Sequence, residues 1–270
     1  SLCEGGGAEL TEYGDYNGLL NRVTQGDCLE VMRLIPDKSI DMILCDLPYG
    51  VTARNKWDEV IPFEPLWEQY ERIIKDNGAI VLTATQPFAS KLVMSNIKLF
   101  RYEWIWQKSY ITGVLNAKKQ PVRNHEQILV FYKKQPTYNP QGIVKVNKMT
   151  RQGTSSLNYG LRDSDNEYYQ ENGNYPRSVQ FISSKGDGKK LHPTQKPVAL
   201  FEYLIKTYTN EGEIVLDNCI GSGTTAVAAI NTGRQFIGIE REPEYVEIAN
   251  KRIAEALERK IGGTSEISKG

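Results

Sequence analysis

The sequence has few of the residues that build disulfide frameworks or structural metal sites. Its 270 residues include only 4 cysteines and 2 histidines, and no Cys-x-x-Cys pair occurs, so we expect no structural zinc ion and no other metal. No run approaches the roughly 18 apolar residues that a membrane-spanning helix needs, and no signal-peptide pattern opens the chain. These absences favour a protein of the reducing cytoplasm. The length and a hydrophobic share of 40% predict one or two globular domains.

Charge is distributed unevenly, although 33 basic and 33 acidic side chains give a net charge of zero. Residues 98–151 contain 11 basic and only 2 acidic side chains, so this segment carries +9 and the rest of the chain −9. Such a segment favours binding to a polyanion such as DNA, although a solvated lysine-rich surface would give the same count. The candidate DNA-binding residues are Lys108, Lys118, Lys119, Arg123, Lys145, Lys148 and Arg151.

Hydrophobic patterning predicts alternating strands and helices in both halves of the chain. Residues 40–45 and 79–82 are short apolar runs typical of buried strands, and residues 62–75 between them have the spacing of a helix. Strand, helix and strand joined by short connections predict a parallel α/β sheet. The remaining predictions are paired strands at 100–107 and 127–132, helices at 198–208, 224–232 and 243–260, and strands at 213–217 and 235–240.

Composition divides the chain into five parts. Residues 1–19 and 262–270 lack an apolar period and are predicted to form a loose N-terminal segment and a flexible tail. Residues 135–190 are rich in Gly, Asn, Ser, Gln and Pro, which is typical of a long functional insert. The α/β pattern occupies residues 20–134 and 191–261, on either side of this insert.

A glycine-rich loop between a predicted strand and a predicted helix is the first candidate binding site. Gly221 and Gly223 allow a sharp turn and the close approach of a ligand, and the helix N-terminus behind them attracts an anion. Glu240 stands 23 positions after Asp217, at the end of the next strand, where a carboxylate can accept both ribose hydroxyls of a nucleoside. No lysine follows the glycines, which excludes a P-loop.

Three interpretations of this loop are open: a structural turn, the dinucleotide site of a nicotinamide oxidoreductase, and a site for S-adenosylmethionine. The loop lies near the C-terminus, which leaves little chain for the second nucleotide-binding half of an oxidoreductase. Asp217 before the loop suits a ligand with a cationic amine better than a pyrophosphate. S-adenosylmethionine has such an amine, a carboxylate for the helix N-terminus and a ribose for Glu240.

The second candidate site is the turn Asp46-Leu47-Pro48-Tyr49-Gly50, directly after the predicted strand 40–45. Ligands of parallel sheets bind at this end of a strand. Because Leu47 precedes a proline, it is held in an extended conformation that directs its carbonyl. The Asp46 carboxylate and that carbonyl can then accept both hydrogens of one amino group, while Tyr49 offers a flat face to a base. The alternative is a plain strand-ending turn with a surface Asp and a core Tyr.

Taken together, the two motifs resemble D-P-P-Y and D-x-F-x-G-S-G-T of the amino-group DNA methyltransferases. Their order, catalytic turn first and cofactor loop last, is similar to the beta group of that family, in which the target-recognition region lies between them, as residues 135–190 do here. The resemblance covers roughly residues 20–135 and 190–258. Leu47 replaces the first Pro of the family motif, and Asn218-Cys219 replace Pro-Phe. Further matches are Gln25-Gly26-Asp27, Asn124-His125-Glu126 and His192-Pro193-Thr194-Gln195-Lys196-Pro197.

The resemblance implies a fold and a set of site residues. The fold is a Rossmann-like methyltransferase fold, α/β, with a mostly parallel seven-stranded sheet, an antiparallel strand and a circularly permuted motif order. The implied catalytic residues are Asp46, Leu47, Pro48 and Tyr49. The implied cofactor-binding residues are Asp27, Asp46, His192, Thr194, Lys196, Asp217, Cys219, Gly221, Ser222, Gly223, Thr224, Thr225 and Glu240.

The expected activity is transfer of a methyl group from S-adenosylmethionine to N6 of adenine in a specific DNA sequence, with base flipping. Cytosine-N4 enzymes of this family usually carry Ser at the position of Asp46, so Asp46 favours adenine. No Pro-Cys pair occurs, which excludes the family that methylates carbon 5 of cytosine. The alternatives are a cytosine-N4 enzyme, an RNA target, and a catalytically silent nucleic-acid-binding module on the same scaffold.

The expected partner is double-stranded DNA, in the cytoplasm of a prokaryotic cell. The resemblance also allows a cognate restriction endonuclease and a homodimer.

Overall fold

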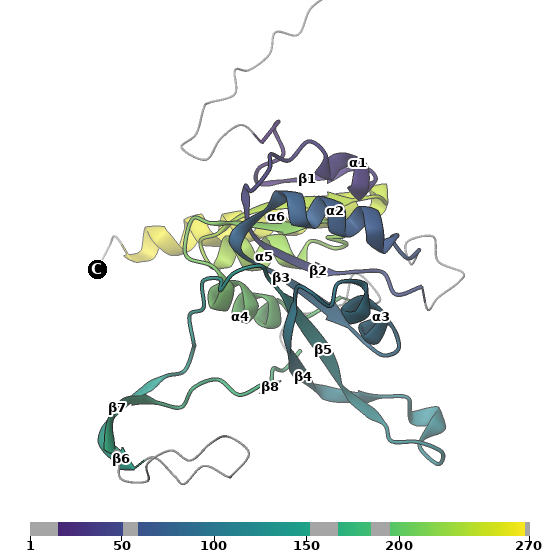
Figure 1. Ribbon diagram of the computed structural model, residues 1–270. Helices are drawn as coiled ribbons and strands as arrows, with labels where there is room; N and C mark the ends of the chain where they lie inside the picture. The colour runs from purple at the N-terminus through teal and green to yellow at the C-terminus, as the bar shows by residue number, and fades with distance from the viewer. Residues whose placement is uncertain (1–15, 51–58, 152–166, 185–194, 268–270) are drawn as a thin grey trace, which may run out of the picture. The chain divides into compact units, whose positions relative to one another are not determined.

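The computed structural model describes residues 16–50, 59–151, 167–184 and 195–267 (Figure 1). It divides into two compact units, residues 139–178 and the remainder of the chain. The larger unit contains an eight-stranded sheet, and the smaller contains a two-stranded sheet. None of the helices within the described ranges is long and apolar enough to cross a membrane.

The large sheet has the strand order β1-β10-β9-β2-β3-β5-β4-β8. Its strands are β1 (Arg22–Gln25), β2 (Ile40–Asp46), β3 (Ile74–Ala84), β4 (Phe100–Thr112), β5 (Arg123–Phe131), β8 (Val179–Phe181), β9 (Ile214–Asp217) and β10 (Gln235–Glu240). β5 is antiparallel to both of its neighbours, whereas the other pairs are parallel. The expected α/β fold with one antiparallel strand is therefore confirmed. The eighth strand exceeds the seven expected because β8 pairs along the outer edge of β4.

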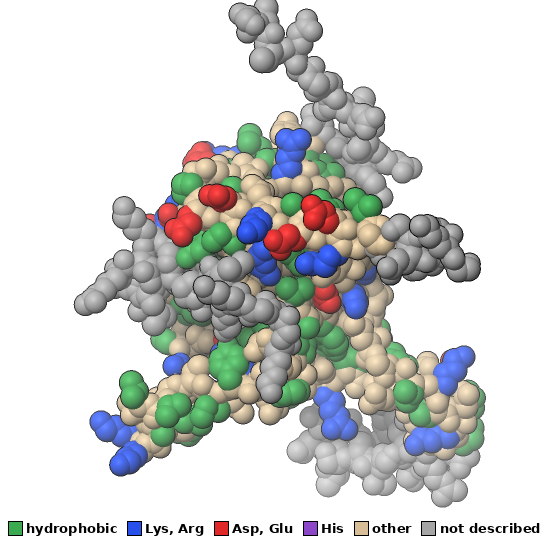
Figure 2. All heavy atoms as spheres, turned by 180° about the vertical axis from the view of Figure 1, so that it is seen from behind, with side chains coloured by type: hydrophobic (Ala, Val, Ile, Leu, Met, Phe, Trp, Pro, Cys, Tyr) green, Lys and Arg blue, Asp and Glu red, His purple; other side chains and the backbone are tan. Residues whose placement is uncertain are grey.

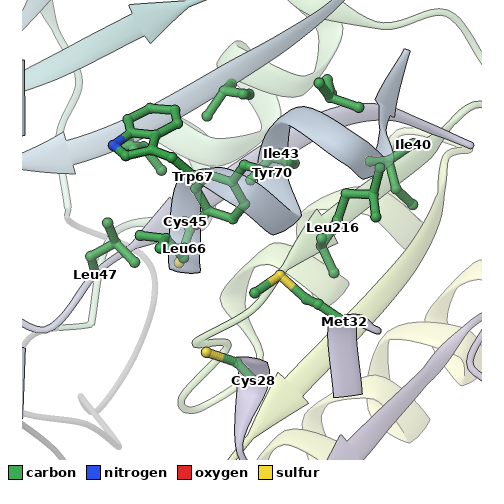
Figure 3. Packing of buried hydrophobic residues seen from close by; sticks show 14 of the residues in the cluster. Cys28, Met32, Ile40, Ile43, Cys45, Leu47, Leu66, Trp67, Tyr70 and Leu216 are labelled. Carbon is green, nitrogen blue, oxygen red and sulfur yellow. The ribbon is translucent and has the colours of Figure 1, made fainter. Parts of the chain in front are cut away.

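Helices cover both faces of the large sheet. They are α1 (Cys28–Met32), α2 (Phe63–Ile73), α3 (Phe88–Ser95), α4 (Val198–Tyr208), α5 (Thr224–Asn231) and α6 (Pro243–Ile267). One core cluster joins α1, α2 and α3 to one face of the sheet, and a second cluster joins α4, α5 and α6 to the other. Figure 3 shows the first cluster, in which Leu66 and Tyr70 of α2 and Met32 of α1 lie beside strand side chains.

The alternation of side chains along β2 explains why residues 42–45 of this strand are all apolar. Ile43 and Cys45 belong to the cluster beneath α1, α2 and α3, whereas Met42 and Leu44 belong to the cluster beneath α4, α5 and α6. A strand covered on both faces needs apolar residues at every position. The prediction of a buried strand at residues 40–45 is thus confirmed, and its end places Asp46 at the carboxyl edge of the sheet.

The predicted strand pair of residues 100–107 and 127–132 is present but longer than expected. β4 continues to Thr112, and β5 begins at Arg123, paired with Thr112. A short 3-10 helix, η2 (Val114–Asn116), lies in the connection. Figure 1 shows the resulting hairpin extending away from the helices.

The smaller unit occupies most of the insert that composition had marked at residues 135–190. β6 (Val144–Arg151) pairs with β7 (Glu167–Gly173) in antiparallel fashion. Patterning missed both strands because polar residues dominate them, so the usual apolar alternation of a half-buried strand is weak. A role of this insert in target recognition stays a prediction.

Candidate active site

The two candidate motifs lie at the ends of adjacent strands. β2 pairs directly with β9, so Asp46 and Asp217, the last residues of these parallel strands, lie at the same edge of the sheet. The loops that follow line one pocket with about 1030 Å³ of empty space, part of it open to solvent. A topological crevice of this kind is where α/β proteins bind ligands. The pocket also takes in Gly26, Asp27, Cys28, Glu59, Ile61, Gln195, Lys196, Phe201, Glu240 and Arg241.

Asp46 is held by three neighbouring side chains. Its Oδ1 accepts hydrogen bonds from the hydroxyls of Tyr49, at 2.9 Å, and Thr83, at 2.6 Å. Its Oδ2 lies 3.1 Å from Nζ of Lys196. Burial, followed by the charge of Asp46, raises the pKa of Tyr49 well above its ordinary value, so this phenol stays a hydrogen-bond donor. The carboxylate is therefore oriented and partly exposed to the pocket, with 18% of its side-chain surface accessible.

Lys196 is the centre of a buried chain of alternating charges. Its ammonium group contacts Asp46 on one side and Oε2 of Glu126 on the other, at 3.1 Å, and Oε1 of Glu126 pairs with Lys108 at 2.5 Å. Burial alone would lower the pKa of Lys196, but the charges of Asp46 and Glu126 raise it well above its usual range. Burial would likewise raise the pKa of Glu126, yet Lys196 and Lys108 lower it. Lys196 and Glu126 are consequently both charged at neutral pH.

The glycine loop is built by backbone geometry and by contacts to α6. Gly221 and Gly223 have positive φ angles of 54° and 88°, a conformation that favours glycine. A β-carbon on Gly223 would stand 2.9 Å from Cβ of Ala249, so this position also permits close packing of α6. Arg252 of α6 donates hydrogen bonds to the carbonyl and hydroxyl oxygens of Ser222. Glu240 accepts the backbone N–H of Gly221 at 2.8 Å, which ties the loop to the end of β10.

Asp217 lies beneath this loop. Its Oδ2 accepts the hydroxyl of Thr225 at 2.5 Å, and its Oδ1 accepts the backbone N–H of Cys219 at 3.0 Å. Burial raises the pKa of Asp217 to about 7, although these two hydrogen bonds act in the opposite direction. A cationic group in the pocket would favour the ionised form of this carboxyl.

Most residues predicted from the sequence for catalysis or cofactor binding line this one pocket. They are Asp27, Asp46, Leu47, Pro48, Tyr49, Lys196, Asp217, Cys219, Gly221, Ser222, Thr224 and Glu240. Gly223 and Thr225 lie behind the lining, in the contacts described above. Asp27 has a structural task as well, because its carboxylate caps α1 by accepting the N–H of Leu29. His192 and Thr194 lie outside the described residues.

The candidate DNA-binding residues fall into two groups, with one exception. Lys118, Lys119 and Arg123 are exposed on the β4–β5 hairpin, and Lys145 and Lys148 are exposed on β6 of the smaller unit, which Arg151 ends. Lys108 is the exception, because it is only 9% accessible and paired with Glu126. It is thus not available to a phosphate in this structure, contrary to the expectation from charge counting.

Two polar residues around Asp46 were missing from the predicted site, Thr83 and Glu126. No sequence signal marks Thr83, which reaches Asp46 because β3 pairs with β2 in register at these two residues. Glu126 carries a signal: it is one of only two acids in the +9 segment and stands two positions before the apolar run of residues 128–131. Lys108 also continues the period-two alternation of the buried Trp104 and Trp106, which indicates an inward direction.

The described lining of the pocket is acidic overall. It contains the carboxylates of Asp27, Asp46, Glu59, Asp217 and Glu240 but only the cations of Lys196 and Arg241. Such a lining is suited to a positively charged ligand and would repel a polyphosphate.

Comparison with known proteins identifies the family. A family model of DNA methylases matches residues 40–251. The chain belongs to the DNA methylase family. This methylase is 30% identical to the DNA adenine methyltransferase YhdJ of Escherichia coli K12, over 97% of the chain and 95% of that protein. It is 29% identical to the type II methyltransferase M.HinfI of Haemophilus influenzae, over 89% of the chain and 70% of that protein.

Solved structures agree with this assignment. The complex of M1.HpyAVI with S-adenosylmethionine (SAM) matches 86% of the methylase and 98% of its own chain, with a TM-score of 0.59 and 26% identity. The cytosine-N4-specific PvuII DNA methyltransferase matches 89% of the methylase and 92% of its own chain, with a TM-score of 0.60. At 17% identity, the latter likeness supports the fold alone.

Proposed function

We propose that this DNA methylase transfers a methyl group from S-adenosylmethionine to N6 of adenine in a specific sequence of double-stranded DNA. The observation that carries the proposal is the meeting of the Asp46-Leu47-Pro48-Tyr49 turn and the Gly221-Ser222-Gly223 loop in one pocket. The first can hold an amino group and the second a cofactor. The 30% identity to a protein named as a DNA adenine methyltransferase supports adenine as the target.

The described residues fit S-adenosylmethionine. The ligand carries a sulfonium and an amine, and five carboxylates against two cations line the pocket. Glu240 would hold the ribose, because its two oxygens already bind the N–H groups of Gly221 and Glu242 and are fixed in place by them. The N-terminus of α5 would hold the carboxylate, and Asp217 would face the amine. When bound, the cofactor supplies a methyl group on a positively charged sulfur.

The Asp46 carboxylate, the Leu47 backbone carbonyl and the Tyr49 ring of the catalytic turn would prepare the nitrogen for attack. The exocyclic amine of adenine is a weak nucleophile because its lone pair is delocalised into the ring. Hydrogen bonds from this amine to the Asp46 carboxylate and the Leu47 carbonyl favour a pyramidal nitrogen, whose lone pair is available. Tyr49 stacks on the flipped base. Lys196 and Thr83 hold Asp46 in position throughout, and such preorganised electrostatics provide much of the rate.

The proton released from the methylated nitrogen needs an acceptor in the pocket. Asp46 is the carboxylate in contact with the amine in this arrangement, and its Oδ2 is paired with Lys196. A charged acceptor forms hydrogen bonds roughly twice as strong as a neutral hydroxyl does. The stronger hydrogen bond favours Asp over Ser at position 46 as the group that accepts from the amine, although the same chemistry would serve N4 of cytosine.

Nucleoside analysis tests the proposal. DNA from cells expressing the methylase is digested to nucleosides and examined by mass spectrometry, beside Asp46→Ala and the exposed control Glu68→Ala. N6-methyladenine should be present with the wild type and the control and absent with Asp46→Ala. Detection of N4-methylcytosine alone would overturn the adenine assignment, and the absence of both modified bases would overturn the methyl-transfer reaction itself.

Thermal-shift measurement separates the cofactor classes independently of DNA. S-adenosylhomocysteine should raise the melting temperature of the protein, whereas NAD should leave it unchanged. The expected place of the reaction is the cytoplasm of a prokaryotic cell, since both curated relatives named above are bacterial. A partner endonuclease, a homodimer, and target recognition by residues 135–190 stay predictions.

A further inference from the structure

The tip of the β4–β5 hairpin, residues 109–124, is an unusual surface. β4 and β5 are paired as far as Thr112 and Arg123, and η2 closes the connection. Figure 1 shows this tip extending beyond the covered part of the sheet. The tip takes no part in either core cluster, so its residues are not explained by the stability of the fold.

Apolar side chains point into solvent at this tip. Leu115 is 101% accessible, Val114 is 58% accessible and Ile111 is 53% accessible. Single exposed apolar residues are ordinary on protein surfaces, but several gathered on a projecting element mark an interaction site.

The same tip is positively charged. Residues 109–124 contain Lys118, Lys119 and Arg123 and no acidic residue. All three are exposed. Figure 2 shows green and blue side chains together on the projecting hairpin, at the lower left of that view. A surface with positive charges alone complements a polyanion better than it complements a protein surface that carries both acids and bases. The charge of the tip therefore favours a polyanion as its ligand.

The base of the hairpin is part of the active site. Lys108 of β4 and Glu126 of β5 belong to the charge chain that ends at Asp46. Leu115 follows Lys108 by 7 residues, so the chain between them spans at most roughly 23 Å even if it were fully extended. This length corresponds to about seven base-pair steps of DNA. One duplex that delivers a base to Asp46 can therefore also contact the tip.

We propose that the hairpin tip is a second DNA-binding element, in which Leu115 acts as an apolar wedge between base steps. Lys118, Lys119 and Arg123 would contact the phosphates around it. Insertion of Leu side chains unstacks and kinks a duplex, and unstacking assists the extrusion of a base into an enzyme pocket. The inference deepens the proposed function and rests on it, because it requires duplex DNA as the substrate.

The test compares duplexes that differ in the cost of base extrusion. Methylome sequencing first identifies the target sequence. Methyl transfer is then measured on a fully paired duplex and on the same duplex with an abasic site opposite the target adenine. Leu115→Ser is compared with wild type and with Met94→Ser, a control on α3 that is 69% accessible. Because Leu115 is fully exposed, its replacement leaves the fold intact.

A wedge predicts different effects on the two substrates. For Leu115→Ser, kcat/KM should fall about tenfold or more on the paired duplex and by less than about twofold on the unpaired one, since the target base there is already free to leave the stack. Met94→Ser should match wild type on both. Equal losses on the two substrates, or no loss on either, would overturn the inference.

Two further outcomes, self-association of the chain through the tip and failure of the proposed function, can be distinguished from the loss of a wedge. A change of sedimentation coefficient in Leu115→Ser without a change in methylation would assign the tip to contact between copies of the chain and overturn the wedge. Failure of the proposed function itself would appear as an absence of methyl transfer by the wild-type protein on both duplexes.

Discussion

Replacing Lys196 by Met should strongly destabilise the folded protein. The Met side chain fills a similar volume but leaves Asp46 and Glu126 without the cation that stands 3.1 Å from each. Each contact carries a Coulomb attraction of roughly 5 kcal/mol at an effective dielectric constant of 20, most of it offset by the cost of burying the charges. Removal of one partner from such a buried pair typically costs about 3–5 kcal/mol, because an uncompensated charge is left behind.

Urea denaturation at pH 7.5 measures this cost as the change in unfolding free energy. The matched control is Lys75→Met, which removes a pair with Asp41 at 2.7 Å whose lysine is 41% exposed. Solvent screening should limit the control effect to about 1 kcal/mol or less. A Lys196→Met effect no larger than the control would refute the assignment of a tightly coupled buried chain.

A variant that combines Lys196→Met with Glu126→Gln provides a second check of the contact between these two residues. Glu126→Gln removes one of the two carboxylates that Lys196 neutralises, so the double variant should lose less stability than the sum of the two single variants. The contribution of the Glu126 carboxylate to the stability of the wild-type protein also depends on pH. Because the pKa of Glu126 is lowered from 4.5, its contribution is fully present above that value and is lost as the pH falls below it. Strict additivity of the two variants would contradict a direct contact.

Four further predictions concern the active site and the β4–β5 hairpin. Asp46→Ala should lower the methyl-transfer rate by about 10²–10³ with cofactor affinity almost unchanged; single-turnover rates within a few-fold of wild type would contradict its role. Affinity for S-adenosylhomocysteine should rise as the pH increases through about 7, because burial raises the pKa of Asp217 to about 7 and only the ionised form attracts the amine; Asp217→Asn should flatten this dependence in calorimetric titrations. Gly223→Ala should cost about 2 kcal/mol or more in chemical denaturation, since φ is 88° and a β-carbon would stand 2.9 Å from a side chain of α6; an unchanged midpoint would contradict this packing. Replacing Lys118 and Lys119 by Ala should reduce the slope of log affinity for DNA against log salt by about 2; an unchanged slope would place both lysines away from phosphate.

Local sequence determined much of the site. The apolar run of residues 40–45 is followed by Asp46, and the predicted strand at residues 213–217 ends in Asp217, so local patterning alone places each motif at the end of a strand. In a parallel sheet these ends share one edge. Positive φ at Gly221 and Gly223 is likewise what glycines in a strand-to-helix loop favour.

The tertiary structure decided how the charges are paired. β5 lies between β3 and β4, and the register that pairs Asp46 with Thr83 and Thr83 with Ile128 brings Glu126 to the same edge of the sheet. That register cannot be deduced from the spacing of residues along the chain, because it depends on the pairing of strands that are far apart in sequence. Charge counting therefore placed Lys108 among the residues that meet DNA, whereas the pleat of β4 turns it inward beside Trp106 and onto Glu126. A count of charges along a segment gives the total charge but does not say on which face of a strand each charge lies, whereas the packing of the sheet decides which face is buried.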